Sequence, residues 1–168
     1  WYNIQPDLPE PLPPPKQPET GPPRMEYLGR TMISECLKQE ASDQRWIPIP
    51  DEVRELYIQV GRPRPLYRAL KLEKFLKLKK TRLYYKREDL SPTGSHKTNT
   101  ALAQAYFAAK EGKHTLATET GAGQWGTALT HAARLMGLNC VVFWVRSVYD
   151  WKADRRTFMH LLGATVHA

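Results

Sequence analysis

A lone lysine at the start of a helix-like segment is the residue of this chain best suited to covalent chemistry. Lys97 follows the turn Ser91-Pro-Thr-Gly-Ser-His96 and precedes apolar residues at helical spacing. A neutral lysine amine condenses with an aldehyde, although an ordinary lysine is almost fully protonated at neutral pH. Burial and the positive end of a helix both favour a neutral amine, and the same helix end suits an anion such as a phosphate. Alone, however, a single lysine more often reaches from a helix end into water.

A second motif, over 114–127, places an acid before a glycine-rich turn. It reads His-Thr-Leu-Ala-Thr-Glu-Thr-Gly-Ala-Gly-Gln-Trp-Gly-Thr. Successive backbone N–H groups of such a turn can hold a carboxylate, with Glu119 beside the bound acid. Residues 121–126 also match the Gly-x-Gly-x-x-Gly fingerprint of dinucleotide-binding proteins. That fingerprint expects an acid after the next strand, where this sequence has Arg146, so a nucleotide with a phosphorylated ribose stays open as an alternative.

The elements that must position these motifs alternate between strand and helix after Thr81. The pattern predicts strands over 82–86, 114–118 and 140–145, helices over 96–110, 124–136 and 153–162, and a last strand within 163–168. Such alternation is typical of right-handed crossovers and a parallel sheet with flanking helices. Ligands of open parallel sheets bind at the carboxyl ends of the strands, where we expect Lys97 to lie.

The amino-terminal part of the chain has a different composition. Nine of the 14 prolines fall between Pro6 and Pro23, which predicts an extended or polyproline-like arm. The signal is weak over 28–49, and a helix is then predicted from Asp51, as its cap, through Val60. We therefore predict an arm and weakly patterned segment over 1–50 and an α/β portion over 51–168, cut short at its last residue.

Composition limits the class of protein. Hydrophobic residues make up 41% of the chain and charged residues 25%, which is typical of a globular protein. No apolar run is as long as a membrane helix, so we expect a cytoplasmic protein without a membrane partner. The net charge of +8 includes a lysine-rich stretch over 71–80, but its helical spacing favours a solvated helix face over a nucleic-acid site. Neither the histidines nor the two cysteines have metal-binding spacing, and no metal is predicted.

The two motifs together resemble the tryptophan synthase beta-chain family. The matching residues are Lys-Arg-Glu-Asp-Leu over 86–90, Thr-Gly-Ser-His-Lys-Thr-Asn over 93–99 and Glu-Thr-Gly-Ala-Gly-Gln-Trp-Gly over 119–126. Trp125, where the main branch has histidine, and the opening Trp-Tyr-Asn-Ile over 1–4 indicate the second, divergent branch. The resemblance covers nearly the whole chain. It implies the amino-terminal portion of an α/β fold-type II pyridoxal-phosphate enzyme, preceded by the proline-rich arm.

The resemblance also implies a role for individual residues. Lys97 would bind the aldehyde of pyridoxal 5'-phosphate and later move the proton of the substrate α carbon, and His96 would lie by the cofactor phosphate. Glu119 would assist departure of the hydroxyl and the attack of indole. The residues that would hold the substrate carboxylate are Thr120, Gly121, Ala122, Gly123 and Gln124, the last of which would also contact the cofactor. Arg62 and Arg64 are weaker candidates for binding an acidic substrate, and Arg155 is expected only to line a helix.

The implied activity is that of a lyase in tryptophan biosynthesis. It joins L-serine, or an activated serine, to indole in a β-replacement that yields L-tryptophan and water. The family resemblance also implies a homodimer and makes a tryptophan synthase alpha chain a candidate partner. Trp125 departs from the main-branch pattern, which puts a hydrogen bond from that position in doubt and makes a packing role equally plausible.

Three alternatives stay open at this point. The second glycine- and serine-rich loop for the cofactor phosphate is missing, as is the residue that should face the pyridine nitrogen. In the family both lie beyond the position of Ala168. The favoured interpretation is a tryptophan synthase beta-type enzyme. The first alternative is another fold-type II serine or threonine dehydratase or synthase, the second is a truncated, non-catalytic interaction partner of a complete subunit, and the third is the nucleotide-binding module.

Overall fold

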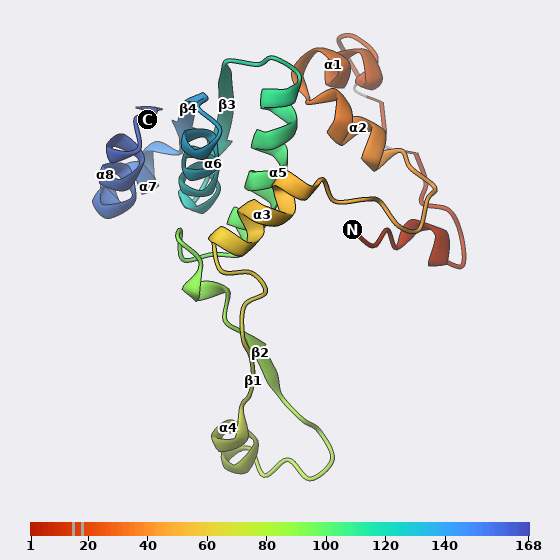
Figure 1. Ribbon diagram of the computed structural model, residues 1–168, viewed down its shortest axis with the longest axis vertical. Helices are drawn as coiled ribbons and strands as arrows, with labels where there is room; N and C mark the ends of the chain where they lie inside the picture. Colours follow the sequence, from red (N-terminus) through yellow and green to blue (C-terminus); the bar gives the residue numbers. More distant parts are fainter. Residues whose placement is uncertain (15, 18) are drawn as a thin grey trace.

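A parallel β-sheet forms the centre of the molecule. A computed structural model describes residues 1–14, 16–17 and 19–168 of the chain. The sheet has the order β3-β4-β5, with β3 (Thr115–Thr120), β4 (Asn139–Trp144) and β5 (Thr165–His167), and all its neighbours run parallel (Figure 1). These are the strands predicted after residue 114, and their parallel arrangement confirms the α/β class.

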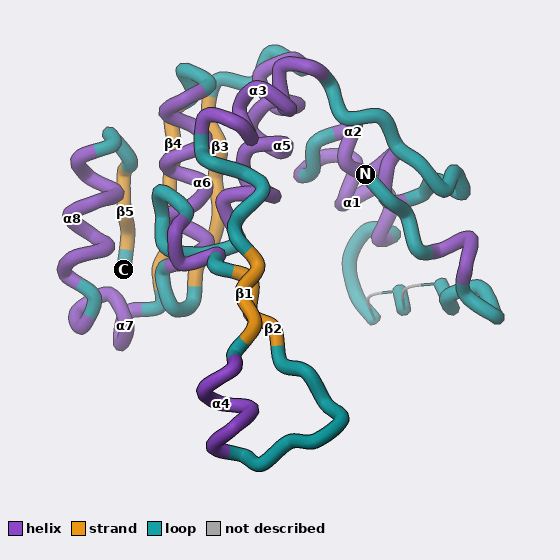
Figure 2. The backbone as a smooth tube through the Cα atoms, turned by 60° about the horizontal axis from the view of Figure 1, so that its bottom comes forward, coloured by secondary structure: helices purple, strands orange, loops and turns teal. Residues whose placement is uncertain are grey.

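One face of this sheet is covered by helices. The helices in contact with the strands are α6 (Gln124–Leu135) and α8 (Ala153–Leu161), and α5 (Lys97–Lys110) packs against α6. The middle one, α6, contacts β3 and β4 and packs between α5 and α8 (Figure 2). Gly126 permits this close approach, because a Cβ at that position would lie 2.8 Å from Cγ1 of Val142. The buried core therefore lies between α6 and the strands, where Leu116 and Trp144 are buried as well.

The other face of the sheet is open. Side chains alternate between the two faces of a strand, so Glu119, Phe143 and His167, which are in register across the three strands, share the uncovered face. Phe143 is 54% exposed, and its ring stacks on that of His167 at 5.2 Å between centroids. The polar and apolar side chains of this face are therefore accessible from outside.

The helix connections bring two helix starts to one edge of the sheet. The chain leaves α5 at Lys110 and enters β3 at Thr115, so β3 runs back alongside the helix that precedes it. From the carboxyl end of β3 the chain enters α6 at Gln124 and returns in the same direction as α5. Lys97 and Gln124, the first residues of these helices, therefore both lie toward the carboxyl edge of the sheet, as expected for ligand-binding residues of this fold.

The predicted strand over 82–86 has a different partner from the one expected. Residues Tyr84–Lys86 form β2, which pairs antiparallel with β1 (Leu66–Arg68) in a separate two-stranded sheet, so its assignment to the parallel sheet was wrong. No strand was predicted over 66–68, so nothing in the sequence signalled this partner. The two strands are close in sequence, and local antiparallel pairing competes well with a distant parallel partner.

These two strands and the helix between them form a lobe that projects from the body, here called the β1–β2 lobe, residues 66–86 (Figures 1 and 2). Its helix, α4 (Leu70–Phe75), is shorter than the lysine pattern over 71–80 predicted. The backbone at Lys77 has a φ of 53°, in the left-handed region, and Leu78 N–H bonds to Glu73 O at 3.0 Å. This geometry ends a helix, because a left-handed residue cannot continue the right-handed turn.

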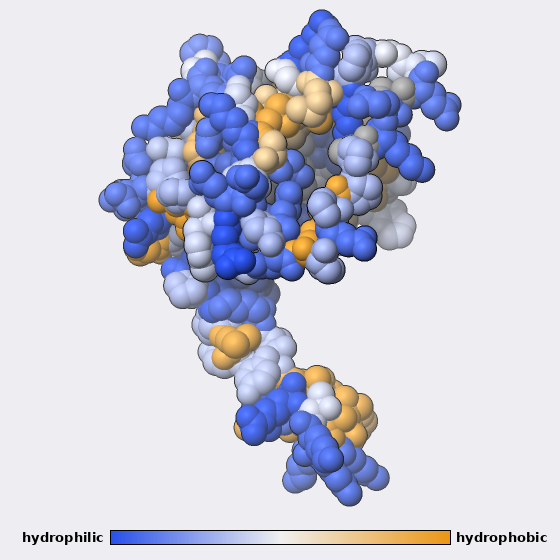
Figure 3. Space-filling view, turned by 90° about the vertical axis from the view of Figure 1, so that its right-hand side faces the viewer, coloured by the Kyte–Doolittle hydropathy of each residue, from blue (hydrophilic) through white to orange (hydrophobic). Residues whose placement is uncertain are grey.

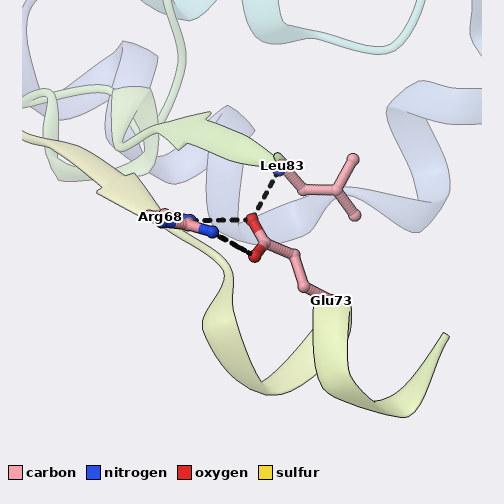
Figure 4. Close-up of polar contacts among 3 residues, drawn as sticks. All are labelled: Arg68, Glu73 and Leu83. Atoms are coloured by element: carbon pink, nitrogen blue, oxygen red, sulfur yellow. Dashed lines mark hydrogen bonds and ion pairs between the residues drawn. The ribbon is translucent and has the colours of Figure 1, made fainter. Parts of the chain in front are cut away.

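The β1–β2 lobe is held together by a buried carboxylate. Glu73 on α4 accepts hydrogen bonds from Nε and Nη2 of Arg68 at 3.0 and 2.9 Å and from the backbone N–H of Leu83 at 2.7 Å (Figure 4). The Arg68 guanidinium, and next the Leu83 N–H, hold the pKa of the Glu73 carboxyl below its ordinary value. The helix is therefore tied to both strands by one side chain.

Short helices precede and follow the core. The amino-terminal segment contains η1 (Gln5–Asp7), α1 (Arg24–Thr31) and α2 (Ser34–Glu40), and the weak signal over 28–49 did not predict the last two. The predicted helix after residue 50 is α3 (Asp51–Gln59), although its cap is Pro50 and Asp51 is its first residue. Two further short helices, η2 (Glu88–Leu90) and α7 (Arg146–Trp151), follow β2 and β4.

The first residues of the chain lie on the body of the protein. Trp1 packs against Phe107 of α5 with 6.3 Å between ring centroids, and Tyr2 pairs with Trp46. The division at residue 50 stays a prediction. Within the part of the chain that the structure describes, no helix has the length and apolar character needed to span a membrane.

Candidate active site

The turn before α5 is stabilised by its own serines. Ser91 Oγ donates to Ser95 O at 2.7 Å and accepts from Ser95 N–H at 2.8 Å, so one side chain closes the turn twice. The next residues are His96, which is exposed, and Lys97, which is half-buried and begins the helix. Among the described residues no side chain caps α5. Asn99 N–H bonds to His96 O at 3.0 Å, whereas the N–H groups of Lys97 and Thr98 have no partner among the described residues and are available to another acceptor.

A buried hydroxyl lies beside this uncapped helix end. Ser95 is 6% exposed, and its Oγ has no hydrogen-bond partner among the described residues. A buried polar atom without a partner costs free energy, and it gains a partner when a ligand with a polar group binds next to it. Ser95, His96 and the start of α5 thus form a place where an anion would be accepted.

The opposite side of α5 is fixed to two other elements. Asn99 Nδ2 donates to Oε2 of Glu88 in η2 at 3.2 Å, and Tyr57 of α3 donates its hydroxyl to Asn99 O at 3.0 Å. Asn99 lies two residues, or about 200° around the helix axis, from Lys97. These contacts therefore hold the helix from behind and leave the side that carries Lys97 unobstructed.

The acid of the second motif, Glu119, is the next-to-last residue of β3. It is exposed and lies on the open face of the sheet. Its neighbour Thr120 is 1% exposed and faces the core, where its Oγ1 accepts a hydrogen bond from Gly126 N–H at 3.2 Å. The buried threonine anchors the end of the strand, while the carboxylate next to it is free to meet a ligand.

The glycine turn after β3 has all three of its carbonyl groups bound by side chains. Trp144 Nε1 donates to Gly121 O at 2.9 Å, Arg155 Nη1 to Ala122 O at 2.6 Å and Thr127 Oγ1 to Gly123 O at 2.7 Å. Within the described residues, the backbone N–H groups of Ala122, Gly123 and Gln124 have no acceptor. The turn thus presents free donors at the start of α6, an arrangement that can accept an anion.

Two contacts of this turn were not expected from the sequence. Arg155 was predicted only to line its helix, yet it reaches a backbone carbonyl of the turn. No sequence pattern signalled this, because the two residues are 33 positions apart. Trp125 does make a hydrogen bond, from its Nε1 to Oγ1 of Thr118 at 2.8 Å. That bond ties the first turn of α6 to β3 rather than pointing at a ligand.

The structure brings the main predicted residues to one edge of the sheet and gives Arg62 and Arg64 other surroundings. His96 and Lys97 begin α5, and Glu119 and the glycine turn end β3, at the carboxyl edge of the sheet. Arg62 instead lies over the ring of Tyr57 with 4.4 Å from its Cζ to the ring centroid. Arg64 is 4% exposed, and its Nε and Nη2 have no partner among the described residues.

A cavity of about 510 Å³ lies elsewhere, between the first residues of the chain, α2 and α5. Its walls include Trp1, Cys36, Asn99 and Phe107, whereas Lys97 and Glu119 do not contribute to it. The predicted site is therefore an open edge and not the cavity. Among the described residues no group of three or more His, Cys, Asp or Glu side chains is arranged to hold a metal ion.

Comparison with known proteins finds a family model and individual relatives that match this chain. A family model described as "Pyridoxal-phosphate dependent enzyme" matches residues 58–168. The chain is 56% identical over 166 residues to "Tryptophan synthase beta chain 2" of Methanothermobacter thermautotrophicus, covering 99% of this chain and 38% of that protein. It is 54% identical over 167 residues to the protein of the same name from Pyrococcus furiosus, covering 99% of this chain and 37% of that protein.

A solved structure shares the fold. A pyridoxal 5'-phosphate-dependent aspartate racemase aligns with a TM-score of 0.53 and 25% identity, over 71% of this chain and 38% of that chain. The chain spans about two fifths of the length of the tryptophan synthase relatives. The family model covers more than half of the chain and includes both motifs, from Lys97 to the glycine turn. This chain therefore belongs to the family of pyridoxal-phosphate dependent enzymes.

Proposed function

We propose that this chain carries the amino-terminal part of the active site of a tryptophan synthase beta-type lyase. The observation that carries the proposal is the placement of Lys97 and the glycine turn at the same edge of the sheet. Lys97 provides an amine at the uncapped start of α5, and the glycine turn provides free N–H groups next to the exposed carboxylate of Glu119. Sequence identity of 54–56% to tryptophan synthase beta chains supports the same reading.

The residues at the start of α5 fit pyridoxal 5'-phosphate. Lys97 would hold the aldehyde carbon, while the uncapped helix end, His96 and the unpartnered Ser95 hydroxyl would bind the phosphate. When bound, the cofactor supplies an electron sink that stabilises negative charge on the substrate α carbon. Once its amine is free again, Lys97 would take the proton from that carbon.

The residues after β3 would position the amino acid. The N–H groups of Ala122, Gly123 and Gln124, with the side chain of Gln124, would bind its carboxylate, and Thr120 would anchor the turn to the core. Glu119 would donate a proton to the departing hydroxyl of L-serine, or to the leaving group of an activated serine. The same carboxylate would then assist the attack of indole.

The overall reaction would be a β-replacement. It joins L-serine or an activated serine to indole and releases L-tryptophan and water. The chain corresponds to about two fifths of its relatives' length, so this activity belongs to the proposal for the longer protein. A homodimer, a tryptophan synthase alpha chain as partner and a cytoplasmic location are parts of the same proposal.

The test asks whether pyridoxal 5'-phosphate attaches covalently to Lys97. The chain is titrated with pyridoxal 5'-phosphate by visible absorbance, reduced with borohydride and mapped by peptide mass, with Lys97→Ala as the variant and Lys110→Ala, at the other end of α5, as the matched control. We expect a saturable band and a label on Lys97 that only the first variant loses. Label spread evenly over surface lysines would refute the assignment of Lys97.

A second arm separates the tryptophan synthase reaction from other chemistry of the family. The full-length protein is supplied with L-serine, with and without indole, and tryptophan and pyruvate are measured. Indole-dependent tryptophan formation is expected. Pyruvate from L-serine at an unchanged rate when indole is added would instead indicate a serine dehydratase.

A further inference from the structure

The glycine turn is tied by side chains from three different elements. Thr127 lies on α6, Trp144 ends β4 and Arg155 lies on α8, and each donates to a different carbonyl of the turn. Three successive carbonyl groups are thus bound, by residues as far as 33 positions away in sequence, and Gly123 O also accepts the backbone N–H of Thr127 at 3.0 Å. A turn held only by its own backbone would need none of these contacts.

Tying the carbonyl groups determines where the free N–H groups point. In a trans peptide unit the C=O and the following N–H point in opposite directions. The carbonyl groups of Gly121, Ala122 and Gly123 belong to the same peptide units as the N–H groups of Ala122, Gly123 and Gln124. Each tether therefore directs the N–H group of its own peptide unit away from the tethering side chain, and none of these three N–H groups has an acceptor among the described residues.

Arg155 differs from the other two tethers because it brings a charge. Its Nη1 lies 2.6 Å from Ala122 O, and no carboxylate pairs with it among the described residues. A cation bound to a carbonyl polarises the whole peptide unit and makes the N–H of Gly123 a stronger donor. Its positive charge next to the turn also favours an anionic ligand over a neutral one.

The side chain of Trp144 is packed against residues of the segment that follows β4. The ring of Tyr149 meets Trp144 edge to face with 5.8 Å between centroids, and the guanidinium of Arg156 lies over the Tyr149 ring at 4.6 Å. The segment after β4 thus reaches the turn twice, through Arg155 directly and through Trp144. A shift of α8 would change the direction of the donors at the end of β3.

We propose that Arg155 is a positioning residue for the substrate carboxylate, acting with Trp144 and Thr127 on the N–H groups of the glycine turn. This inference rests on the proposed function, in which the turn receives the carboxylate of an amino acid. Arg155 does not touch the carboxylate itself. It orients and polarises the donors that do.

The test measures how strongly the glycine turn binds a carboxylate when no cofactor is present and no reaction takes place. Acetate, a simple carboxylate, is titrated into the ¹⁵N-labelled chain, and the amide signals of Ala122, Gly123 and Gln124 are followed for the native chain, Arg155→Met and Arg155→Lys. The methionine variant should bind acetate roughly tenfold more weakly, as expected for the loss of one charge-assisted hydrogen bond. The lysine variant, which keeps a donor and the charge, should recover most of the affinity.

The matched control is Arg146→Met, which removes the same type of side chain from the start of α7. Arg146 bonds to Ala168 O at 3.4 Å and not to the turn, so acetate affinity should be unchanged. Equal acetate affinity for the native chain and Arg155→Met would overturn the proposal, and so would a native turn whose amides do not respond to acetate. Neither result depends on labelling of Lys97, so failure of the proposed function is detected separately.

Discussion

Gly123 controls the shape of the turn at the end of β3. Its φ of 86° is in the left-handed region, and a Cβ built on it would lie 2.3 Å from Cζ2 of Trp144. A side chain at this position would therefore meet both backbone strain and the aromatic ring that donates to Gly121 O. Gly121 differs, because its φ is ordinary and a Cβ there would meet nothing within 4 Å.

Gly123→Ala should therefore lower the free energy of unfolding by roughly 2–4 kcal/mol, from the left-handed backbone and the overlap with Trp144. Gly121→Ala is the matched control and should change it by less than about 0.5 kcal/mol. Urea unfolding of both variants measures the difference. Equal losses at the two positions would contradict the role assigned to Gly123.

His131 on α6 makes stability depend on pH near neutrality. Its Nδ1 is buried without a partner among the described residues, and burial lowers the pKa of the imidazole from its ordinary value of 6.5. The unfolded chain therefore takes up a proton that the folded chain resists, so stability is lost as the pH falls below 6.5.

We expect the melting temperature to fall between about pH 7.5 and about pH 5.5, and His131→Leu to reduce this fall. His114→Leu, at an exposed position, serves as the control. Thermal unfolding followed by circular dichroism at both pH values decides the point. A fall that is the same in the native chain and His131→Leu would exclude this histidine as its cause.

At the scale of elements, the β1–β2 lobe depends on one carboxylate. Glu73 ties α4 to Arg68 of β1 and to Leu83, the residue before β2 (Figure 4). The lowered pKa of the Glu73 carboxyl means that its contribution to stability is present above the ordinary value of 4.5. The contribution is lost as the pH falls below that value and the folded carboxyl is protonated.

Glu73→Gln should increase amide hydrogen exchange in β1 and β2 at neutral pH and leave α5 and α6 protected, because the lobe is tied to itself and not to the sheet. Acidification of the native chain below about pH 4 should produce the same local opening. Glu55→Gln, an exposed change on α3, is the control. Simultaneous opening of α6 in Glu73→Gln would show that the lobe and the core unfold together.

At the scale of the whole molecule, large apolar side chains are distributed over several exposed regions. Phe75 on the lobe is 80% exposed, Phe143 on the open sheet face 54% and Trp151 in α7 84%. The space-filling view shows apolar surface both on the projecting lobe and on the body (Figure 3). Leu102 of α5, in contrast, is completely buried in the core under α6. Exposed apolar groups contribute little to the stability of a single chain, whereas buried ones contribute most of it.

Phe75→Ser should therefore change the free energy of unfolding by less than about 0.5 kcal/mol and reduce the fluorescence of a dye that binds apolar surface. Leu102→Ala, which leaves a cavity in the core, should cost about 2–5 kcal/mol. The two variants are compared by urea unfolding and dye titration. A large loss of stability in Phe75→Ser would mean that the lobe packs on the body in solution.

Most long elements could be predicted from the sequence, whereas short elements and sheet membership could not. The helices α5, α6 and α8 and the strands β3 and β4 were predicted to within two residues at each end, because each has enough residues to show a period. The helices α1, α2 and α7 have no more than eight residues and gave little or no periodic signal. The strand β2 was predicted, but its partner strand was predicted wrongly, because the residue pattern of a strand does not indicate which other strand it pairs with.

The order of the long elements, the lysine at the start of α5 and the glycine turn after β3 follow from local residue patterns. Each requires only residues that are near one another in the chain, and the family resemblance rests on the same stretches. Two of the three tethers of the turn, those from Trp144 and Arg155, by contrast join residues 23 and 33 positions apart, and the support of Asn99 by Tyr57 spans 42 positions. Such contacts exist only once the sheet and helices have packed, because a hydrogen bond requires its atoms to meet within about 3 Å.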